Sequence, residues 1–312
     1  MVASPPRRLA TATAVTAALL AGCGGSSGSG GDSATSRIAA GSSAVPVVAS
    51  TNVYGDIVEQ IGGRRVEVTS IMSDPARDPH SYEVGTQNRL ALSKAEVVIE
   101  NGGGYDDFVD RMLKSDDNSS AQVINAVDVS GRTAPADGEL NEHVWYDIAA
   151  MGKLADAIAA ALAEADPGDA ATFTGNAETF KAKLQPLKAE EARIKREHGG
   201  TAIAVTEPVP LYMTEASGLR NQTPEEFSEA IEEGDDVSPR TLRETLALFT
   251  EGKVELLVYN EQTSGPQTEK VEQAARSAGI PVVPVTETLP EGEDYLGWMT
   301  ANVDALAGAL AK

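Results

Sequence analysis

The sequence predicts an α/β protein of two lobes, each with a parallel-type sheet, linked by one long backbone helix. Short β-branched runs alternate with segments of helical apolar spacing in residues 45–168 and again in 200–312, the pattern of parallel sheets covered by helices. Between these regions, residues 169–199 are rich in alanine, leucine, lysine and glutamate and lack any β-branched run. Two such lobes leave a cleft where the carboxyl ends of their strands face each other, and open α/β sheets bind ligands there.

The first 22 residues have the features of a secretory signal. Arg7 and Arg8 precede an apolar run from Leu9 to Ala21, which is shorter than the roughly 20 residues of a spanning helix. "LAGC" looks like a lipobox, in which Cys23 becomes the acylated first residue of the mature chain and anchors it to the membrane. The alternative, a buried cysteine, lacks a core to be buried in, because the Gly/Ser-rich residues 23–44 have the composition of a flexible tether.

The first lobe is predicted to begin with a strand over 45–51, a helix over 52–63 and a strand over 66–72. Helices over 88–95 and 104–114 alternate with strands over 96–101 and 122–127, and a further helix covers 148–166.

The long helix over 169–199 contains Pro186, which we expect to kink it, and ends with Lys195, Arg196 and His198 before two glycines. Basic residues at a helix C-terminus interact favourably with the helix dipole, and this structural role accounts for the position of His198. In the second lobe, strands over 201–207, 254–260 and 280–287 alternate with helices over 210–219, 241–252, 268–279 and 294–312.

The chain is strongly acidic. It carries 25 basic and 47 acidic residues, for a net charge of −22. Such a surface repels nucleic acid and anionic lipid and raises the local concentration of cations, although solubility alone would account for it. We therefore expect no nucleic-acid partner.

The remaining two histidines both follow strands of the first lobe. His80 lies in "DPHSYE" after the strand over 66–72, and His143 lies in "NEHVWYD" after the strand over 122–127. In the second lobe, Glu207 and Glu287 end the strands over 201–207 and 280–287. The carboxyl ends of four strands thus supply two imidazoles and two carboxylates, which predicts one metal site assembled from both lobes.

These segments resemble the metal-specific solute-binding lipoproteins of bacterial ABC importers, of the zinc/manganese type. "DPHSYE" and "HVWYD" are similar to the two histidine elements of that family, while "TEPVPLYMTEASGL" and "VTETLPEGEDYLGWM" are similar to the segments that bear its third and fourth ligands. The resemblance implies the metal ligands His80, His143, Glu207 and Glu287. It also implies that the protein is not an enzyme, that an ABC permease and its ATPase are its partners, and that it is lipid-anchored at the outer face of the cell membrane. We expect a monomer.

Acidic and aromatic neighbours suggest supporting roles. A metal-bound histidine normally donates its second ring N–H to a carboxylate or carbonyl, so Asp78, Glu83 and Asp147 are candidate partners, with surface acids or helix caps as the alternative. Trp145 is expected to form a wall of the cleft.

The predicted donor set favours Mn²⁺, with Zn²⁺ next and Fe²⁺ third. Carboxylates can bind through both oxygens and raise the coordination number toward six, whereas Zn²⁺ prefers four ligands. Because a ligating imidazole must be neutral, binding is expected to weaken as the pH falls through about 6.5. The alternatives are a secreted metallohydrolase, for which His-Glu-x-x-His is missing from the sequence, and a cell-surface adhesin.

Overall fold

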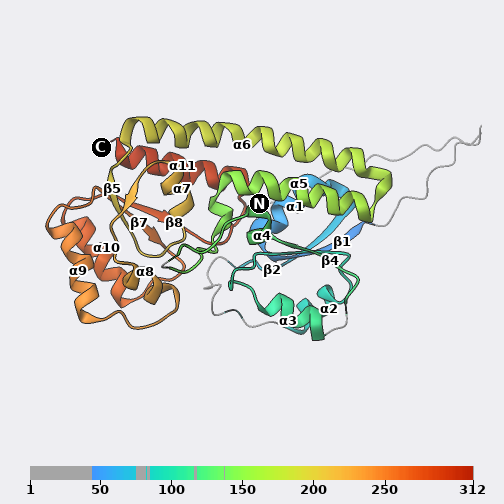
Figure 1. Ribbon diagram of the computed structural model, residues 1–312, viewed down its shortest axis with the longest axis horizontal. Coiled ribbons are helices and arrows are strands. Elements are labelled where there is room, and N and C mark those ends of the chain that lie inside the picture. Colours follow the sequence, from blue (N-terminus) through green and yellow to red (C-terminus); the bar gives the residue numbers. More distant parts are fainter. Residues whose placement is uncertain (1–43, 75–81, 83–84, 116–117, 137, 312) are drawn as a thin grey trace, which may run out of the picture. The chain divides into compact units, whose positions relative to one another are not determined.

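The computed structural model describes residues 44–74, 82, 85–115, 118–136 and 138–311 (Figure 1). The predicted signal peptide, the tether up to residue 43, and the residues Cys23, Asp78, His80 and Glu83 lie outside this described part.

The first lobe contains a parallel sheet with the strand order β2-β1-β3-β4. The central strand β1 (Val45–Thr51) pairs in parallel with β2 (Val66–Met72) and with β3 (Val97–Glu100), and β3 pairs with β4 (Gln122–Asn125). Because all four strands run in the same direction, their carboxyl ends lie at one edge of the sheet.

Helices cover this sheet on both faces (Figure 1). One face carries α1 (Asn52–Gly62), whose first turn is capped by the Thr51 side chain, and α5 (Ile148–Ala165). The shorter helices are α2 (Thr86–Leu92), α3 (Phe108–Ser115) and α4 (Ala126–Ser130), and 3₁₀ turns lie at η1 (Gly63–Arg65), η3 (Val144–Tyr146) and η4 (Pro167–Asp169).

The linking helix α6 (Ala170–His198) continues through Pro186. It packs against α1 and α5 of the first lobe and against α7 and α11 of the second. A helix that contacts both lobes along its length resists bending between them.

The second lobe repeats the topology of the first, with the strand order β6-β5-β7-β8. Its strands are β5 (Ala202–Val205), β6 (Arg220–Asn221), β7 (Leu256–Asn260) and β8 (Val282–Val285). Its helices are α7 (Leu211–Ala216), α8 (Glu225–Glu232), α9 (Pro239–Thr250), α10 (Pro266–Ser277) and α11 (Tyr295–Leu310).

The two lobes share one hydrophobic core. A single cluster of buried side chains runs from the first sheet through α5, α6 and α11 to one face of the second sheet, and a smaller cluster lies between the other face and α8 to α10. Hydrogen bonds add to this contact: Asn52 exchanges two of 3.0 Å with the backbone of Leu289, and Asp56 accepts one of 2.9 Å from Tyr295 N.

The predicted fold class is confirmed, and the differences lie at the ends of elements and in a few short elements. The helix expected from residue 104 begins at Phe108, because Gly102, Gly103 and Gly104 adopt φ angles of +78°, +68° and +103° and form a turn. A Cβ atom at Gly102 would lie 2.1 Å from the Asn125 side chain. The elements α4, β6 and α8 were not predicted, and the strand expected over 122–127 ends at Asn125, where α4 begins. Within the described residues, no helix combines the length and apolar composition needed to cross a membrane.

Candidate metal centre

Three of the four predicted ligands converge between the lobes. His143 immediately precedes η3, and Glu207 and Glu287 each lie two residues beyond the carboxyl end of a strand, β5 and β8. His143 Nε2 lies 3.7 Å from Glu287 Oε2. Their side chains are almost fully enclosed, with 0% exposure for His143 and Glu287 and 1% for Glu207.

The His143 ring is oriented by Asn141. Asn141 Oδ1 lies 2.8 Å from His143 Nδ1 and also accepts a hydrogen bond of 3.1 Å from the His143 backbone N–H. An amide oxygen can only accept, so Nδ1 carries the proton and the lone pair of the neutral ring is on Nε2. The imidazole therefore presents a metal-binding nitrogen to Glu287.

The Glu287 carboxylate receives hydrogen bonds from both lobes. Tyr105 OH donates to Oε2 at 3.2 Å from the first lobe, and Asn260 Nδ2 donates to Oε1 at 2.8 Å from the second. Burial and the neighbouring Glu287 raise the pKa of Tyr105 well above its usual value, so its hydroxyl stays neutral and acts as a donor. Glu287 thus links the two lobes at the site.

Glu207 is held through one oxygen only. Thr263 Oγ1 donates to Glu207 Oε2, while Glu207 Oε1 is buried and has no hydrogen-bond partner among the described residues. Burial first and the charge of Glu287 second raise the pKa of Glu207 to about 8, although the polar groups of Thr263 and Asn260 and the charge of His143 lower it in part. A buried oxygen that lacks a donor is suited to a cation.

Aromatic rings enclose the imidazole. The Trp145 ring centroid lies 5.0 Å from that of His143 at an interplanar angle of 70°, and Tyr105 packs 5.0 Å from Trp145. Trp145 itself is fully buried, and its carbonyl accepts a hydrogen bond of 2.8 Å from Tyr295 OH. These contacts fix the ring of His143 and keep water from its faces.

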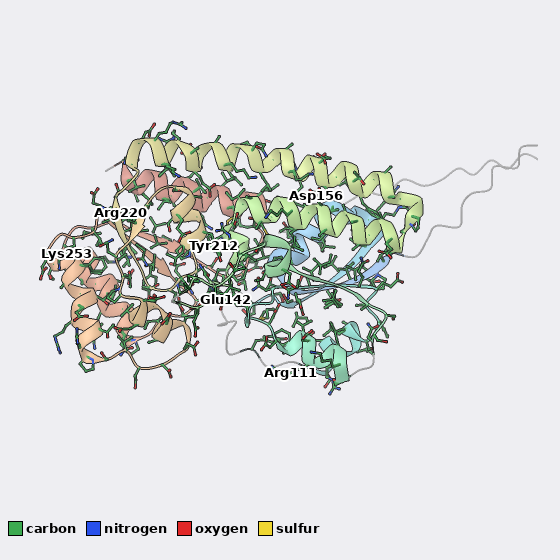
Figure 2. The ribbon with its side chains drawn as sticks, viewed as in Figure 1. Arg111, Glu142, Asp156, Tyr212, Arg220 and Lys253 are labelled. Atoms are coloured by element: carbon green, nitrogen blue, oxygen red, sulfur yellow. The ribbon has the colours of Figure 1, made fainter. Side chains whose placement is uncertain are left out.

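An acidic cleft of about 1220 Å³ lies beside this site, and its lining includes Asn141 and Glu232, which approach the Nδ1 side of His143. It is lined from the first lobe by Asn141 and Glu142 and from the second by Pro208 and Tyr212, and Figure 2 shows Glu142 and Tyr212 where the lobes meet. Its remaining acidic lining residues are Glu139, Glu215, Glu225, Glu229, Glu232 and Glu233.

Two of these acids approach His143 from its Nδ1 side. Glu232 Oε1 lies 3.6 Å from Nδ1, and together Glu142, His143 and Glu232 form a group of potential metal-binding atoms that all lie within 4.8 Å of one another. Because Nδ1 carries a proton and donates it to Asn141 Oδ1, this nitrogen has no lone pair for a metal ion. The Nε2 side, by contrast, offers a nitrogen lone pair beside the Glu287 carboxylate.

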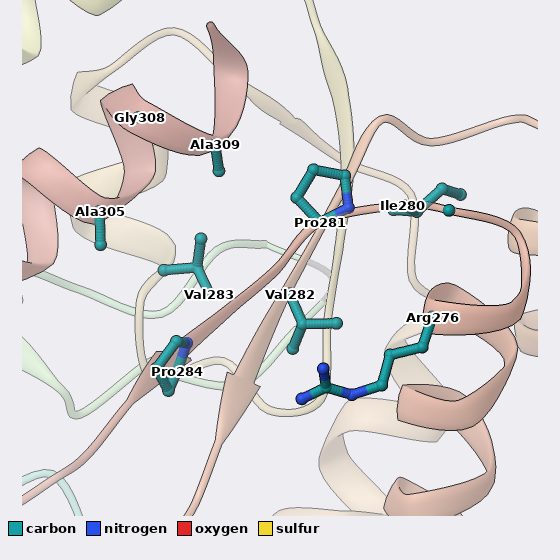
Figure 3. A pocket seen from close by; sticks show the side chains of 10 residues that line it. Arg276, Ile280, Pro281, Val282, Val283, Pro284, Ala305, Gly308 and Ala309 are labelled. Atoms are coloured by element: carbon teal, nitrogen blue, oxygen red, sulfur yellow. The ribbon is translucent and has the colours of Figure 1, made fainter. Parts of the chain in front are cut away.

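A separate hollow of about 710 Å³ lies between β8, the end of α10 and the end of α11 (Figure 3). Its lining is largely apolar, including Ile280, Pro281 and Val283, and contains no carboxylate or imidazole. This hollow lacks the chemistry of a metal site.

The structure places one predicted supporting residue elsewhere. Asp147 accepts hydrogen bonds from Ala149 N and Ala150 N as the N-cap of α5, and Arg132 binds its other oxygen at 2.5 to 2.9 Å. Its expected role beside His143 is taken by the Asn141 amide, which lies two residues before the histidine.

Comparison with known proteins identifies the family. Residues 47–309 match the family model described as "Zinc-uptake complex component A periplasmic". The chain belongs to this family. The resemblance seen in the sequence is therefore confirmed, and a family of uptake-complex components does not support the metallohydrolase alternative.

Several known proteins are similar to this chain. The manganese-binding lipoprotein MntA of Halalkalibacterium halodurans is 30% identical over 174 residues, a match that covers 56% of this chain and only about half of MntA (55%). The manganese ABC transporter substrate-binding lipoprotein scaA of Streptococcus gordonii is 25% identical over 290 residues, 87% of this chain and 90% of that protein. The periplasmic zinc-binding protein TroA of Treponema pallidum shares the fold, with a TM-score of 0.73 at 20% identity, over 86% of this chain and all of TroA.

Proposed function

We propose that this protein captures a divalent transition metal ion outside the cytoplasm and delivers it to an ABC permease with its ATPase. The observation that carries the proposal is the burial of His143, Glu207 and Glu287 in one place between the lobes. Burying an ionised carboxylate costs several kcal/mol unless a cation compensates it, so without a cation the group keeps its proton, as the raised pKa of Glu207 indicates. Within the described residues, no lysine or arginine forms an ion pair with Glu207, so the compensating cation would be the bound metal.

The proposed ligands are His143 Nε2, Glu207 and Glu287, together with His80. The proposal for His80 rests on the sequence, because its position in "DPHSYE" resembles the first histidine element of the family. Two imidazoles and two carboxylates suit Mn²⁺, Zn²⁺ or Fe²⁺. We favour Mn²⁺, because the relatives MntA and scaA are named for manganese.

Delivery requires that the protein stays close to its permease. We propose that Cys23 is lipidated and anchors the chain to the outer face of the cell membrane, and that residues 23–44 act as a tether for a monomeric binding domain. Metabolic labelling with a radioactive fatty acid tests the anchor: the label should appear in the full-length protein and be lost in Cys23→Ser.

Equilibrium dialysis with elemental analysis tests metal capture. The purified protein should hold one equivalent of Mn²⁺ or Zn²⁺, and His143→Ala should lose it. The matched control is His198→Ala at the end of α6, which should keep full stoichiometry. A wild-type protein without bound metal would contradict the proposal and leave the adhesin alternative. Equal retention by both variants would contradict the role of His143.

A further inference from the structure

The turn that follows β7 contacts both carboxylates of the site. Asn260 is the last residue of β7, and its side chain donates to Glu287 Oε1 at 2.8 Å and to Thr263 Oγ1 at 3.0 Å. Thr263 in turn donates to Glu207 Oε2. One short segment therefore connects two glutamates that are 80 residues apart in the sequence.

The same turn also fixes the backbone that carries Glu287. Gln262 Oε1 accepts from Glu287 N at 2.5 Å and from Thr288 N at 3.0 Å, and Asn260 N donates to Thr206 Oγ1 at 2.9 Å, one residue before Glu207. Asn260 is buried at 1% exposure. The donors are consequently preorganised, and the carboxylates cannot rotate without breaking hydrogen bonds.

In each glutamate the turn engages a single oxygen. It occupies Oε2 of Glu207 and Oε1 of Glu287, and it does not contact Glu207 Oε1 or Glu287 Oε2. The latter lies 3.7 Å from His143 Nε2 and accepts a hydrogen bond of 3.2 Å from Tyr105 OH. Each carboxylate therefore has one oxygen bound by the turn, and its second oxygen, which in Glu287 also accepts from Tyr105, is the one that would coordinate an ion.

We propose that Asn260 and Thr263 determine metal selectivity by restricting Glu207 and Glu287 to one coordinating oxygen each. This inference rests on the proposed function and names the residues that set the metal selectivity of the site. Two carboxylates that bind through both oxygens supply four donor atoms, which suits a six-coordinate ion such as Mn²⁺; through one oxygen each they supply two, which suits four-coordinate Zn²⁺. The turn thus shifts the ratio of the two affinities toward Zn²⁺, relative to an unrestrained set of the same ligands.

The test is the ratio of the dissociation constants for Mn²⁺ and Zn²⁺ in Thr263→Val, measured by competition with a chelator. Valine has the shape of threonine but cannot donate, so Glu207 gains its second oxygen for the ion. We expect the ratio to shift toward Mn²⁺ by about tenfold, within the range typical of altered outer hydrogen bonds. Thr263→Ser keeps the hydroxyl and should retain the wild-type ratio. X-ray absorption at the manganese edge should show an additional oxygen neighbour in Thr263→Val only.

Asn260→Ala provides a second test at the other glutamate, with its folding checked by circular dichroism. A shift toward Mn²⁺ in this variant also supports the inference. If Thr263→Val weakens both metals equally, or changes neither, the turn does not set selectivity and the inference fails while the proposed function stands. If the wild-type protein binds neither metal, the proposed function fails and the inference with it.

Discussion

Asn141 joins the imidazole of His143 to the other lobe. Its Oδ1 lies 2.8 Å from His143 Nδ1, and its Nδ2 donates at 2.9 Å to the carbonyl of Pro208, the residue that follows Glu207. The Asn141 carbonyl also accepts a hydrogen bond of 2.6 Å from Tyr212 OH. A single side chain therefore fixes the tautomer of one proposed ligand and its position relative to another.

Replacing Asn141 with alanine should weaken metal binding by about 10- to 100-fold, the usual effect of removing a partner of a ligating histidine. Asn141→Asp keeps an acceptor for Nδ1–H and should lose much less affinity. Isothermal titration calorimetry measures both. Asn118→Ala is the control, since Asn118 donates to the carbonyls of Leu92 and Ala95, accepts from Ser120 Oγ, and makes none of these bonds to a proposed metal ligand. Equal affinities for Asn141→Ala and Asn118→Ala would show that Asn141 does not support the site.

The two sides of the His143 ring can be told apart by paired glutamine substitutions. Glu287→Gln on the Nε2 side removes a charged ligand and should reduce affinity by more than about 100-fold, beyond the effect of an outer partner. Glu232→Gln lies on the Nδ1 side, where Asn141 blocks coordination, and should change affinity only a few-fold. Chelator competition measures both variants. The opposite ranking would place the ion on the Nδ1 side.

The sequence predicted the architecture because each lobe obeys simple rules. β-branched runs and helical periodicity identified the strands of both sheets except β6, which has only two residues. His143, Glu207 and Glu287 were selected by the strand-end rule, which states that ligands bind where the carboxyl ends of parallel strands meet at one edge of a sheet. The short helix α8 was missed because four of its eight residues are glutamate and only Phe227 and Ser228 are buried. The helix α4 was missed because its first residues, Ala126 and Val127, continue the apolar pattern of the strand before them.

The hydrogen-bonding partners of the site could not be predicted with the same success. Asp147 was expected near His143, but its position before α5 favours capping the helix. Asn141 and Tyr105 reach the site through loops, whose path depends on tertiary contacts and leaves no periodic signal in the sequence. Asn260 is the exception: it ends β7, so the strand-end rule that selected the glutamates would also have selected it.

Metal binding should release a proton at neutral pH. The pKa of Glu207 in the metal-free protein is raised to about 8, so its carboxyl is mostly protonated at pH 7 and must lose that proton to bind a cation. Burial lowers the pKa of His143, but the acids around it, Glu287 first, outweigh burial and raise the pKa overall. Affinity should therefore begin to fall below about pH 8 and not only near 6.5.

Calorimetry in two buffers with different ionisation enthalpies measures this release. About one proton per metal ion is expected at pH 7, and affinity should rise by about tenfold per pH unit between 6 and 8. Glu207→Gln has no proton to lose at this position and should release less. Proton release near zero in the wild-type protein would contradict a neutral Glu207.

The lobes should move little when metal is released. They share a continuous core through α5, α6 and α11, and Tyr146 OH donates at 2.7 Å to the Thr286 carbonyl across the interface. Small-angle scattering should give radii of gyration that agree within about 1 Å with and without metal, as for preorganised binding proteins. A difference of several ångströms would show that the shared core opens.

The linking helix contains a buried acid that is separate from the metal site. Glu191 of α6 is 6% exposed, and its Oε1 has no hydrogen-bond partner among the described residues. Burial, assisted by the charge of Asp147, raises its pKa to about 7, and Lys188 offsets this only in part. The folded state therefore binds this proton more tightly than the unfolded state does.

Because the folded-state pKa of Glu191 is the higher one, stability should fall as the pH rises from about 4.5 to 7, and the loss should be complete above that range. Glu191→Gln cannot ionise, so the variant should gain about 2 kcal/mol over the wild-type protein between pH 5 and pH 8. Urea unfolding at both pH values with a chelator present measures this difference. Glu178→Gln on the same helix is the control, since Glu178 is exposed beside Lys181 and its substitution removes one surface carboxylate without touching a buried one. Parallel pH profiles for wild type and Glu191→Gln would mean that Glu191 is charged in the folded protein at neutral pH.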